Sequence, residues 1–292
     1  MTRHLRLLVF ALAFCASCAT QTPTFFDAPN LLVPQRTTQA LSGSAFGRKI
    51  ILADEQSREQ AIVEQYRQGN VPDYLRTFSK VRFISRTRSG KQAEVTLWVL
   101  PDYLAVGSNR DFLRTPMTPI SAQIIADQYD LALPTVKIVD AIYQAAGVKL
   151  DPRPFKPGPK MVTVGELIRH NKVIQSSLHD QIPKSLVAGH KKDIVVSNTL
   201  LRKPNRVAIY GWHLRSGSAI QPLTTVHGAW YADYSHGVRL MAKTMVINNV
   251  TYKVADVLKD PELSALISYE GPMKTVRYDT NQSLRKKWWP QS

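Results

Sequence analysis

Histidine is concentrated in one part of this sequence. Six of the seven histidines lie between His170 and His236, and the remaining one is His4. Within residues 190–240 they are accompanied by lysine, aspartate, serine and arginine side chains. Imidazole titrates near neutral pH, and together with carboxylate and amine groups it can move protons, activate a nucleophile or bind a metal ion. This part of the chain is therefore the predicted functional site.

Two apolar runs are expected to position the first of these side chains. Ile194–Ser197 and Val207–Trp212 are separated by a polar turn, a pattern that predicts an antiparallel hairpin. His190 comes just before the first run and His213 follows the second. In a hairpin both histidines would lie at the same end of the strand pair.

A third apolar run, Val238–Val246, begins soon after His236. If this strand is antiparallel to Val207–Trp212, His236 joins His190 and His213 at one sheet edge. The same edge would then collect three more charged residues, Lys191, Asp193 and Asp233. We expect the three histidines to converge there on a rim that water can reach.

One chemistry for this edge is metal-dependent hydrolysis. A catalytic Zn²⁺ takes three nitrogen or oxygen ligands and a water molecule. Four residues supply such ligands: His213, His227, Asp233 and His236. Lys191 or Arg239 would stabilise the oxyanion that forms when the water attacks a carbonyl. The spacing matches no standard motif such as His-Glu-x-x-His, so zinc is predicted from the residue types alone.

Two alternatives use no metal. In the first, a serine nucleophile attacks, with a histidine as base and an aspartate to orient it. Its candidates are Ser235 and Ser108, then His190, His213 or His236, then Asp193 or Asp233. In the second, the chain binds a wall polymer without cleaving it. Aromatic residues that interleave with the histidines would then stack on sugars or complete a core: Trp212, Trp230, Tyr231 and Tyr234.

Further substrate contacts are expected outside the histidine-rich segment. Pro101–Pro119 reads as a long loop, and loops of this kind often carry functional residues. The polar side chains predicted to contact a substrate are Asp102, Ser108 and Arg114 from this region, with Asp111 beside them, and His170, Trp212 and Tyr234 from later in the chain.

The first residues read as an export signal. Two arginines precede the apolar run Leu7–Phe14, and Cys15-Ala-Ser-Cys18 is similar to the lipobox of bacterial lipoproteins, whose last cysteine carries the lipid. We expect residues 1–18 to be a lipoprotein-type signal peptide and Cys18 the lipidation site, with ordinary cleavage as the alternative. No thiol would then remain for catalysis or structural metal binding in the mature domain.

The net charge is +16, and cleavage of the signal would remove two arginines and no acidic residue. Such a charge suits contact with nucleic acid, anionic lipid head groups or an acidic envelope polymer, although a basic protein without a specific acidic partner has the same composition. Among these partners we expect an acidic envelope polymer or peptidoglycan rather than nucleic acid. The membrane would be reached through the lipid anchor. The expected location is the bacterial outer membrane or periplasm, otherwise the medium.

Three motifs resemble an uncharacterised family of secreted bacterial proteins and lipoproteins. They are Ala188-Gly-His-Lys-Lys-Asp193, Tyr210-Gly-Trp-His213 and Asp233-Tyr-Ser-His-Gly237. The resemblance implies an envelope setting and transfers no activity. Together with the histidine-rich segment it predicts an envelope-associated hydrolase that cleaves an amide or peptide bond in peptidoglycan or a similar polymer.

The predicted fold is α+β, with a mixed, mostly antiparallel sheet and helices packed on it. Residues 19–47 read as a tether and irregular segment, and 48–292 as one domain with a proline-rich strap at 151–160. Capping patterns predict helices starting after Asp54, Thr118, Thr135 and Thr163 and a last one near Asp260. Alternation and turn residues predict hairpins over 81–100 and 238–254. The helix after Asp54 has a thin apolar stripe and is expected at the surface.

Overall fold

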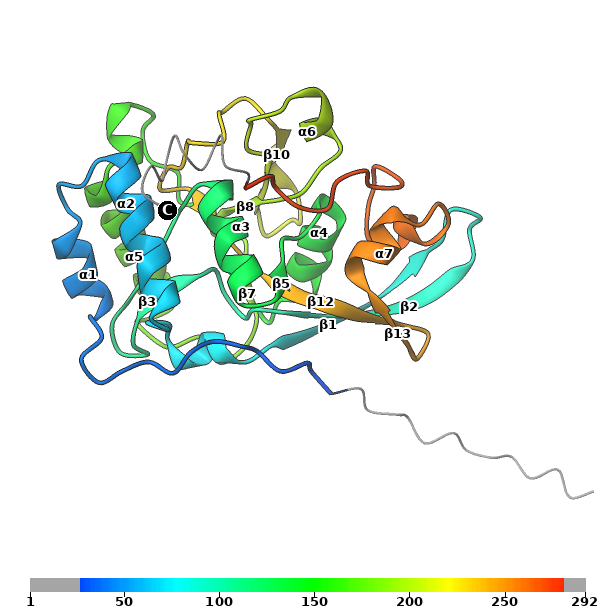
Figure 1. The fold of residues 1–292 in the computed structure, drawn as a ribbon, viewed down its shortest axis with the longest axis horizontal. Helices are drawn as coiled ribbons and strands as arrows, with labels where there is room; N and C mark the ends of the chain where they lie inside the picture. Colours follow the sequence, from blue (N-terminus) through cyan, green and yellow to red (C-terminus); the bar gives the residue numbers. More distant parts are fainter. Residues whose placement is uncertain (1–26, 281–292) are drawn as a thin grey trace, which may run out of the picture.

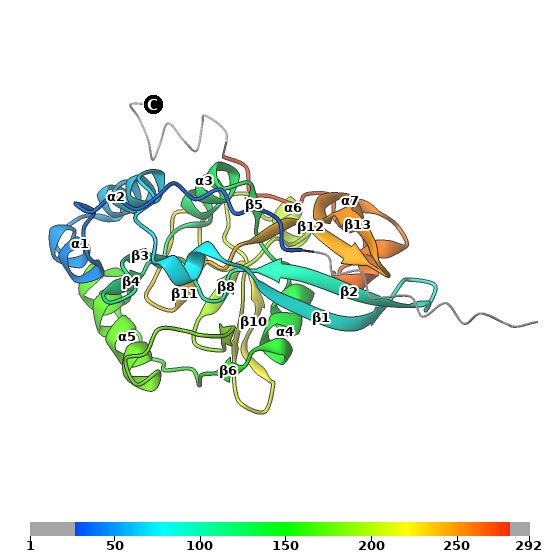
Figure 2. The same ribbon diagram turned by 90° about the horizontal axis from the view of Figure 1, so that it is seen from below.

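The computed structural model describes residues 27–280, which form two main β-sheets with helices packed against them (Figures 1 and 2). The larger sheet is antiparallel, in the order β1-β2-β12-β13, and β5 also pairs with β12. β2 lies between two neighbours and is buried along most of its length, whereas the outer strand β1 has exposed positions. The strands are β1 (Ser79–Arg86), β2 (Gln92–Val99), β5 (Leu131–Ala132), β12 (Met241–Ile247) and β13 (Val250–Lys253).

The smaller sheet has the order β10-β9-β8-β11. Its β8–β9 and β9–β10 pairs are antiparallel and its β8–β11 pair is parallel, so the mixed, mostly antiparallel α+β fold is confirmed. Its strands are β8 (Lys192–Ile194), β9 (Ile209–His213), β10 (Ala219–Thr224) and β11 (His236–Gly237). Two further strand pairs are β3 (Ala105–Gly107) with β4 (Phe112–Arg114), and β6 (Val148–Lys149) with β7 (Val187–Ala188).

The helices begin where the capping patterns predict. The side chains of Asp54, Thr118, Thr135 and Thr163 each accept a hydrogen bond from a backbone N–H in the first turn of the helix that follows. The helices are α1 (Gly43–Lys49), α2 (Glu55–Arg67), α3 (Pro119–Gln128), α4 (Val136–Ala145), α5 (Val164–Ser177), α6 (Thr199–Arg202) and α7 (Val254–Lys259), with 3₁₀ turns at Asp73–Arg76, Pro159–Val162 and Leu263–Leu266.

The expectation that α2 is a surface helix was wrong. Ile62, Val63 and Tyr66 are buried, and so are the charged residues Arg58 and Glu59, which form an ion pair. Glu59 also accepts a hydrogen bond from the Thr118 N–H at the start of α3. Pairing of buried polar groups lets α2 pack against α3 although its apolar stripe is thin.

Two other expectations needed correction. Pro101–Pro119 is not a plain loop, because β3 and β4 form a short hairpin within it. The last predicted helix is a 3₁₀ turn, Leu263–Leu266, and the regular helix α7 lies just before it. By contrast, the two predicted hairpins are present, and Asn248 and Asn249 take positive φ values of 47° and 64° in the turn between β12 and β13.

Figure 1 shows α1, α2 and α5 gathered at one end of the molecule, while the tips of the β1–β2 and β12–β13 hairpins project at the other. The smaller sheet lies between these ends. Phe155 of the strap donates its backbone N–H to the Tyr234 hydroxyl at 2.6 Å. Within residues 27–280 no helix is long and apolar enough to cross a bilayer.

Candidate functional site

The predicted pairing of the first two strands is confirmed, and that of the third is wrong. β8 and β9 pair antiparallel, with Lys192 opposite Gly211. His236 instead lies on β11, which is parallel to β8, and β12 belongs to the larger sheet. The rings of His190, His213 and His236 are all buried, so they do not form the rim reached by water that the sequence predicted.

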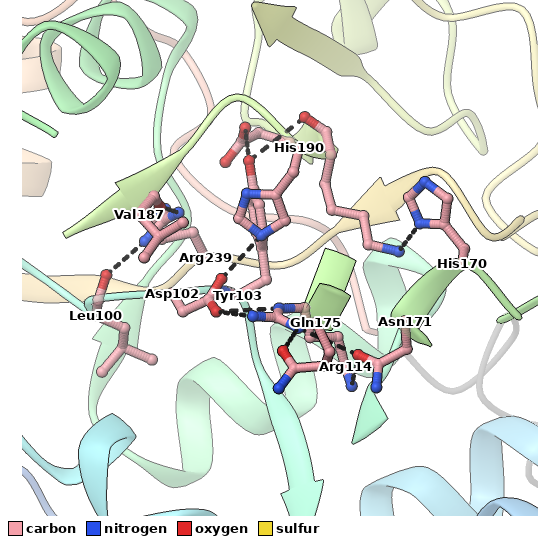
Figure 3. A network of polar contacts seen from close by, with 12 residues as sticks. Leu100, Asp102, Tyr103, Arg114, His170, Asn171, Gln175, Val187, His190 and Arg239 are labelled. Carbon is pink, nitrogen blue, oxygen red and sulfur yellow. Dashed lines mark hydrogen bonds and ion pairs between the residues drawn. The ribbon is translucent and has the colours of Figure 1, made fainter. Parts of the chain in front are cut away.

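His190 is held in a buried network with an aspartate and an arginine (Figure 3). Its Nε2 lies 3.1 Å from Asp102 Oδ1, and Arg114 Nε donates to Asp102 Oδ2 at 3.0 Å. Arg114 also donates to the side-chain oxygens of Asn171 and Gln175 on α5, at 3.2 and 2.7 Å. Asp102 and Arg114, expected as loop residues touching a substrate, are thus buried partners of each other.

The charge states in this network follow from its contacts. Burial acts to raise the pKa of the Asp102 carboxyl, but the Arg114 guanidinium and His190 outweigh it and hold this pKa well below its ordinary 3.8. Burial lowers the pKa of His190 to about 4 despite Asp102. A neutral His190 therefore donates from Nε2 to Asp102. Its Nδ1 has no hydrogen-bond partner among the described residues and is free to accept a proton.

Lys191 lies next to this network, buried between His170 and Tyr234. Its Nζ is 3.0 Å from His170 Nδ1 and donates to the Tyr234 carbonyl. Burial lowers the pKa of Lys191 to about 7, Arg114 adds to this shift, and Asp233 opposes it. Burial and Lys191 likewise hold the pKa of His170 far below its usual range, so this ring accepts from the ammonium. Lys191 can thus lose and regain a proton near neutral pH.

Asp193 on β8 is also buried, two residues after Lys191, and it contacts Tyr103. The Tyr103 hydroxyl donates to Asp193 Oδ2 at 2.8 Å. Burial raises the pKa of Asp193 to about 6, although Arg239 acts to lower it. Arg239 itself lies over the Tyr103 ring and donates to the carbonyls of Leu100 and Val187. Its guanidinium therefore ties together the ends of β2 and β7, and the structure does not aim it at an open oxyanion position.

His213 belongs to a separate pair at the end of β9, an inner strand of the smaller sheet. Its Nε2 lies 2.9 Å from Asp140 Oδ1 on α4, and the hydroxyls of Tyr210 and Tyr269 donate to the same carboxylate at 2.8 and 3.0 Å. The imidazole stacks on Tyr143 at 4.5 Å between ring centroids. The backbone of His213 therefore lies at the same end of the β8–β9 pair as that of His190, while the His213 ring turns toward α4.

His227 and His236 lie before and within β11. The His227 ring stacks on Tyr231 at 4.0 Å, and the Tyr231 hydroxyl donates to Asp233 Oδ2 at 2.9 Å. Burial lowers the pKa of His236 to about 4, although Asp233 acts to raise it. Ser235 donates both its N–H and its hydroxyl to Asp233 Oδ1, at 2.7 and 2.6 Å. The Ser235 hydroxyl thus closes a turn and is not paired with a histidine base.

The four predicted zinc ligands do not surround one point. His213 is engaged by Asp140, apart from His227, Asp233 and His236, and within residues 27–280 no three histidine, aspartate or glutamate side chains are arranged to hold a metal ion. The donor set as predicted therefore does not fit Zn²⁺, and we derive no step through a metal.

Other predicted residues have local roles. Ser108 lies in the β3–β4 turn, where its hydroxyl accepts from the Asp111 N–H at 3.3 Å. Trp212 has a positive φ of 57°, which is rare for a bulky residue and is held here by packing against Leu167 and Tyr234. Cys18 lies outside the described residues. The sequence analysis missed Tyr103 and Asp140, and the one carboxylate in the mainly apolar helix α4 was the available signal for the latter.

Gly237 gives a test of how tightly this interior is packed. A Cβ at this position would lie 2.6 Å from a Tyr103 ring atom and 2.7 Å from Lys191 Cβ. We expect Gly237→Ala to lower the free energy of unfolding by about 1–3 kcal/mol through overpacking, measured by chemical denaturation. Gly165→Ala in α5 meets only a distant Thr163 atom and should instead stabilise by about 0.5–1 kcal/mol. Equal behaviour of the two variants would contradict this account.

No protein-family model, curated protein or solved structure matches this chain. The resemblance carried by the three motifs stays a prediction, and the function must be inferred from the geometry of the site.

Proposed function

We propose that this chain is an envelope-associated hydrolase that cleaves an amide bond in peptidoglycan or a similar polymer, with Lys191 as its central group. The supporting observation is the buried lysine itself. Its pKa lies near 7, and its Nζ contacts a histidine ring and a backbone carbonyl rather than a carboxylate. Burying an amine without an ion-pair partner disfavours folding, and such perturbed groups are concentrated at functional sites.

The neighbouring side chains suit acid–base chemistry at neutral pH. Neutral Lys191 would take a proton from the attacking water, and the resulting hydroxide would add to the amide carbonyl. Asp193, whose pKa is raised to about 6, is the candidate acid that returns a proton to the leaving amine. His190, oriented by Asp102, offers a second base through its free Nδ1.

A substrate would reach Lys191 only after the strap moves. The Phe155 ring stacks on Tyr234 at 4.7 Å and meets His170 edge-on at 5.2 Å, so it packs against both residues that hydrogen-bond to the Lys191 Nζ. Lys191 itself is 1% exposed. The strap 151–160 is therefore the segment whose displacement would open the site.

The test is incubation of the full mature chain with purified bacterial wall sacculi. We expect release of soluble fragments and, after labelling with an amine-reactive reagent, new amino groups that identify amide cleavage. Sedimentation of the chain with sacculi without release of fragments would instead favour the polymer-binding alternative. Neither binding nor release would reject both.

The envelope location is a separate part of the proposal. It rests on the amino-terminal pattern that ends at Cys18. In a bacterial host, radioactive palmitate should label the chain, and the labelled chain should fractionate with membranes. Cys18→Ala should abolish the labelling and the membrane association. Export without labelling of the wild-type chain would leave a secreted protein in place of a lipoprotein.

A further inference from the structure

A cavity of about 630 Å³ opens where α1, β4 and α5 meet, at the end of the molecule away from the β1–β2 tip (Figure 2). Three basic side chains line it, namely Arg48 from α1, Arg110 from the β3–β4 turn and Lys172 from α5. All three residues are exposed. None of these cations has an ion pair or a side-chain hydrogen bond among residues 27–280.

Two carboxylates also line the cavity, and they offset part of this positive charge. Asp111 accepts hydrogen bonds from the Ser44 N–H and hydroxyl, at 2.9 and 3.0 Å, which hold it against the start of α1. Asp180 is the other carboxylate in the lining. Three cations that are distant in sequence therefore share one hollow with two carboxylates, and positive charge remains in excess.

The basic surface continues along α5. A second, more open hollow of about 510 Å³ shares Lys172 and Ser176 with the first and adds Arg153 and Arg169. Arg169 is paired with Glu166 in its own helix, whereas Arg153 belongs to the strap. The cations are thus distributed over two adjoining hollows along α5 rather than gathered around one point. This arrangement suits an extended ligand better than a single ion.

We propose that this cavity and the adjoining hollow bind an extended acidic polymer through its oxyanion groups, phosphate or carboxylate. Arginine forks and lysine ammonium groups match both kinds of group. The inference deepens the proposed function, on which it rests for the natural occurrence of such a polymer in the envelope. The binding itself requires no hydrolysis.

The position of the cavity links it to the buried network. Its wall includes Asn171 and Gln175, whose side-chain oxygens accept from Arg114 on the inner side. Arg114 in turn pairs with Asp102, the partner of His190. A polymer in the cavity would therefore lie one layer of side chains from the candidate site, where it could position a strand of the wall for cleavage.

Fluorescence anisotropy of the full mature chain tests the proposal with three labelled probes: linear polyphosphate, poly-glutamate and neutral dextran. The triple variant Arg48→Ser, Arg110→Ser, Lys172→Ser should bind the acidic probes about tenfold more weakly than the wild type. The matched control Lys49→Ser, Lys91→Ser, Lys203→Ser removes the same charge from exposed positions outside both hollows and should change the affinity by less than about twofold. The stronger of the two acidic probes identifies the oxyanion.

Equal losses in the two triple variants would overturn the site in favour of non-specific attraction to net charge. Equal binding of dextran, or no binding of either acidic probe by the wild type, would overturn it as well. Thermal denaturation of each variant checks that folding is intact. If the acidic probes bind as expected but sacculi are not cleaved, the proposed hydrolysis fails while this site stands.

Discussion

Lys191→Met should abolish the release of fragments from wall sacculi without destabilising the chain. Methionine keeps the length and the apolar stem of lysine but cannot transfer a proton. At about pH 6 the folded wild type must hold a charged ammonium in a buried position. Methionine removes the desolvation cost of that charge. The two lost hydrogen bonds offset part of this gain. We expect the free energy of unfolding to be unchanged or raised by up to about 2 kcal/mol.

The pH dependence gives the same variant a second readout. The pKa of Lys191 is about 7 in the folded chain and 10.5 in its ordinary state, so between these values the unfolded chain binds more protons. The contribution of Lys191 to stability therefore rises as the pH increases through this window. Chemical denaturation at about pH 6 and about pH 9 should show this rise in the wild type and a smaller one in Lys191→Met.

Lys192→Met is the matched control for both measurements. Lys192 is the neighbouring residue, but its Nζ lies over the Trp212 ring and does not contact His170. We expect this variant to keep most of the hydrolytic activity. Full activity in Lys191→Met, or loss of activity only in Lys192→Met, would show that Lys191 is not the catalytic group. Loss of several kcal/mol of stability in Lys191→Met would assign it a structural role.

Arg114→Met is the substitution from which we expect the largest loss of stability. It removes the cation that pairs with the fully buried Asp102 and leaves the side-chain oxygen of Gln175 without the Arg114 donor, while Asn171 keeps only the Arg114 backbone N–H. Breaking a buried pair from one side leaves an uncompensated charge, which costs about 3–5 kcal/mol. Chemical denaturation near neutral pH measures this loss directly.

Measurements of stability at acidic pH distinguish loss of the Arg114–Asp102 ion pair from simple loss of packing. In the wild type the pKa of Asp102 is depressed below 3.8, so its contribution to stability is present above that value and is lost as the pH falls below it. Without Arg114, burial would raise the pKa of Asp102. The contribution of the protonated Asp102 to the free energy of unfolding would then be lost as the pH rises. The deficit of the variant should therefore grow from about pH 4 to neutrality.

Arg169→Met provides the comparison for Arg114. Arg169 forms an ion pair with Glu166 one turn away in α5, and its guanidinium lies 3.7 Å from the centroid of the Phe155 ring. Because the Arg169 side chain is exposed, the loss of both contacts should cost less than about 2 kcal/mol. A loss in Arg114→Met that is no larger, or one that does not vary with pH, would contradict the account of the buried network.

Local patterns predicted much of the secondary structure. The side chains that cap α2 to α5 act within three residues of their own position, and Asn248-Asn249 supplies a positive-φ turn without distant help. Such features depend on neighbours in sequence, which a single chain displays. The surface reading of α2 failed because its buried polar side chains Arg58 and Glu59 satisfy each other and partners far along the chain.

The site was predicted less well because its geometry depends on which strands pair. The apolar runs around His190, His213 and His236 were recognisable as strands, but a run of residues does not specify whether its neighbour is β9 or β8, or whether the pair is parallel. The parallel pairing of β11 with β8 placed His236 beside Tyr231. The β8–β9 pair formed as predicted, but the His213 ring contacts Asp140 on α4, a helix that the strand pattern does not place. The predicted zinc set depended on the alternative pairing.

By itself the sequence determined the class of fold, the starts of the main helices and the segment that holds the imidazoles and Lys191, because these follow from local propensity and composition. Only the tertiary structure decided that Asp102 and Arg114 meet His190, that Lys191 lies against His170, and that Arg48, Arg110 and Lys172 share a cavity. Burial and charge pairing between distant segments set the titration of these groups, and neither is encoded in the spacing of residues along the chain.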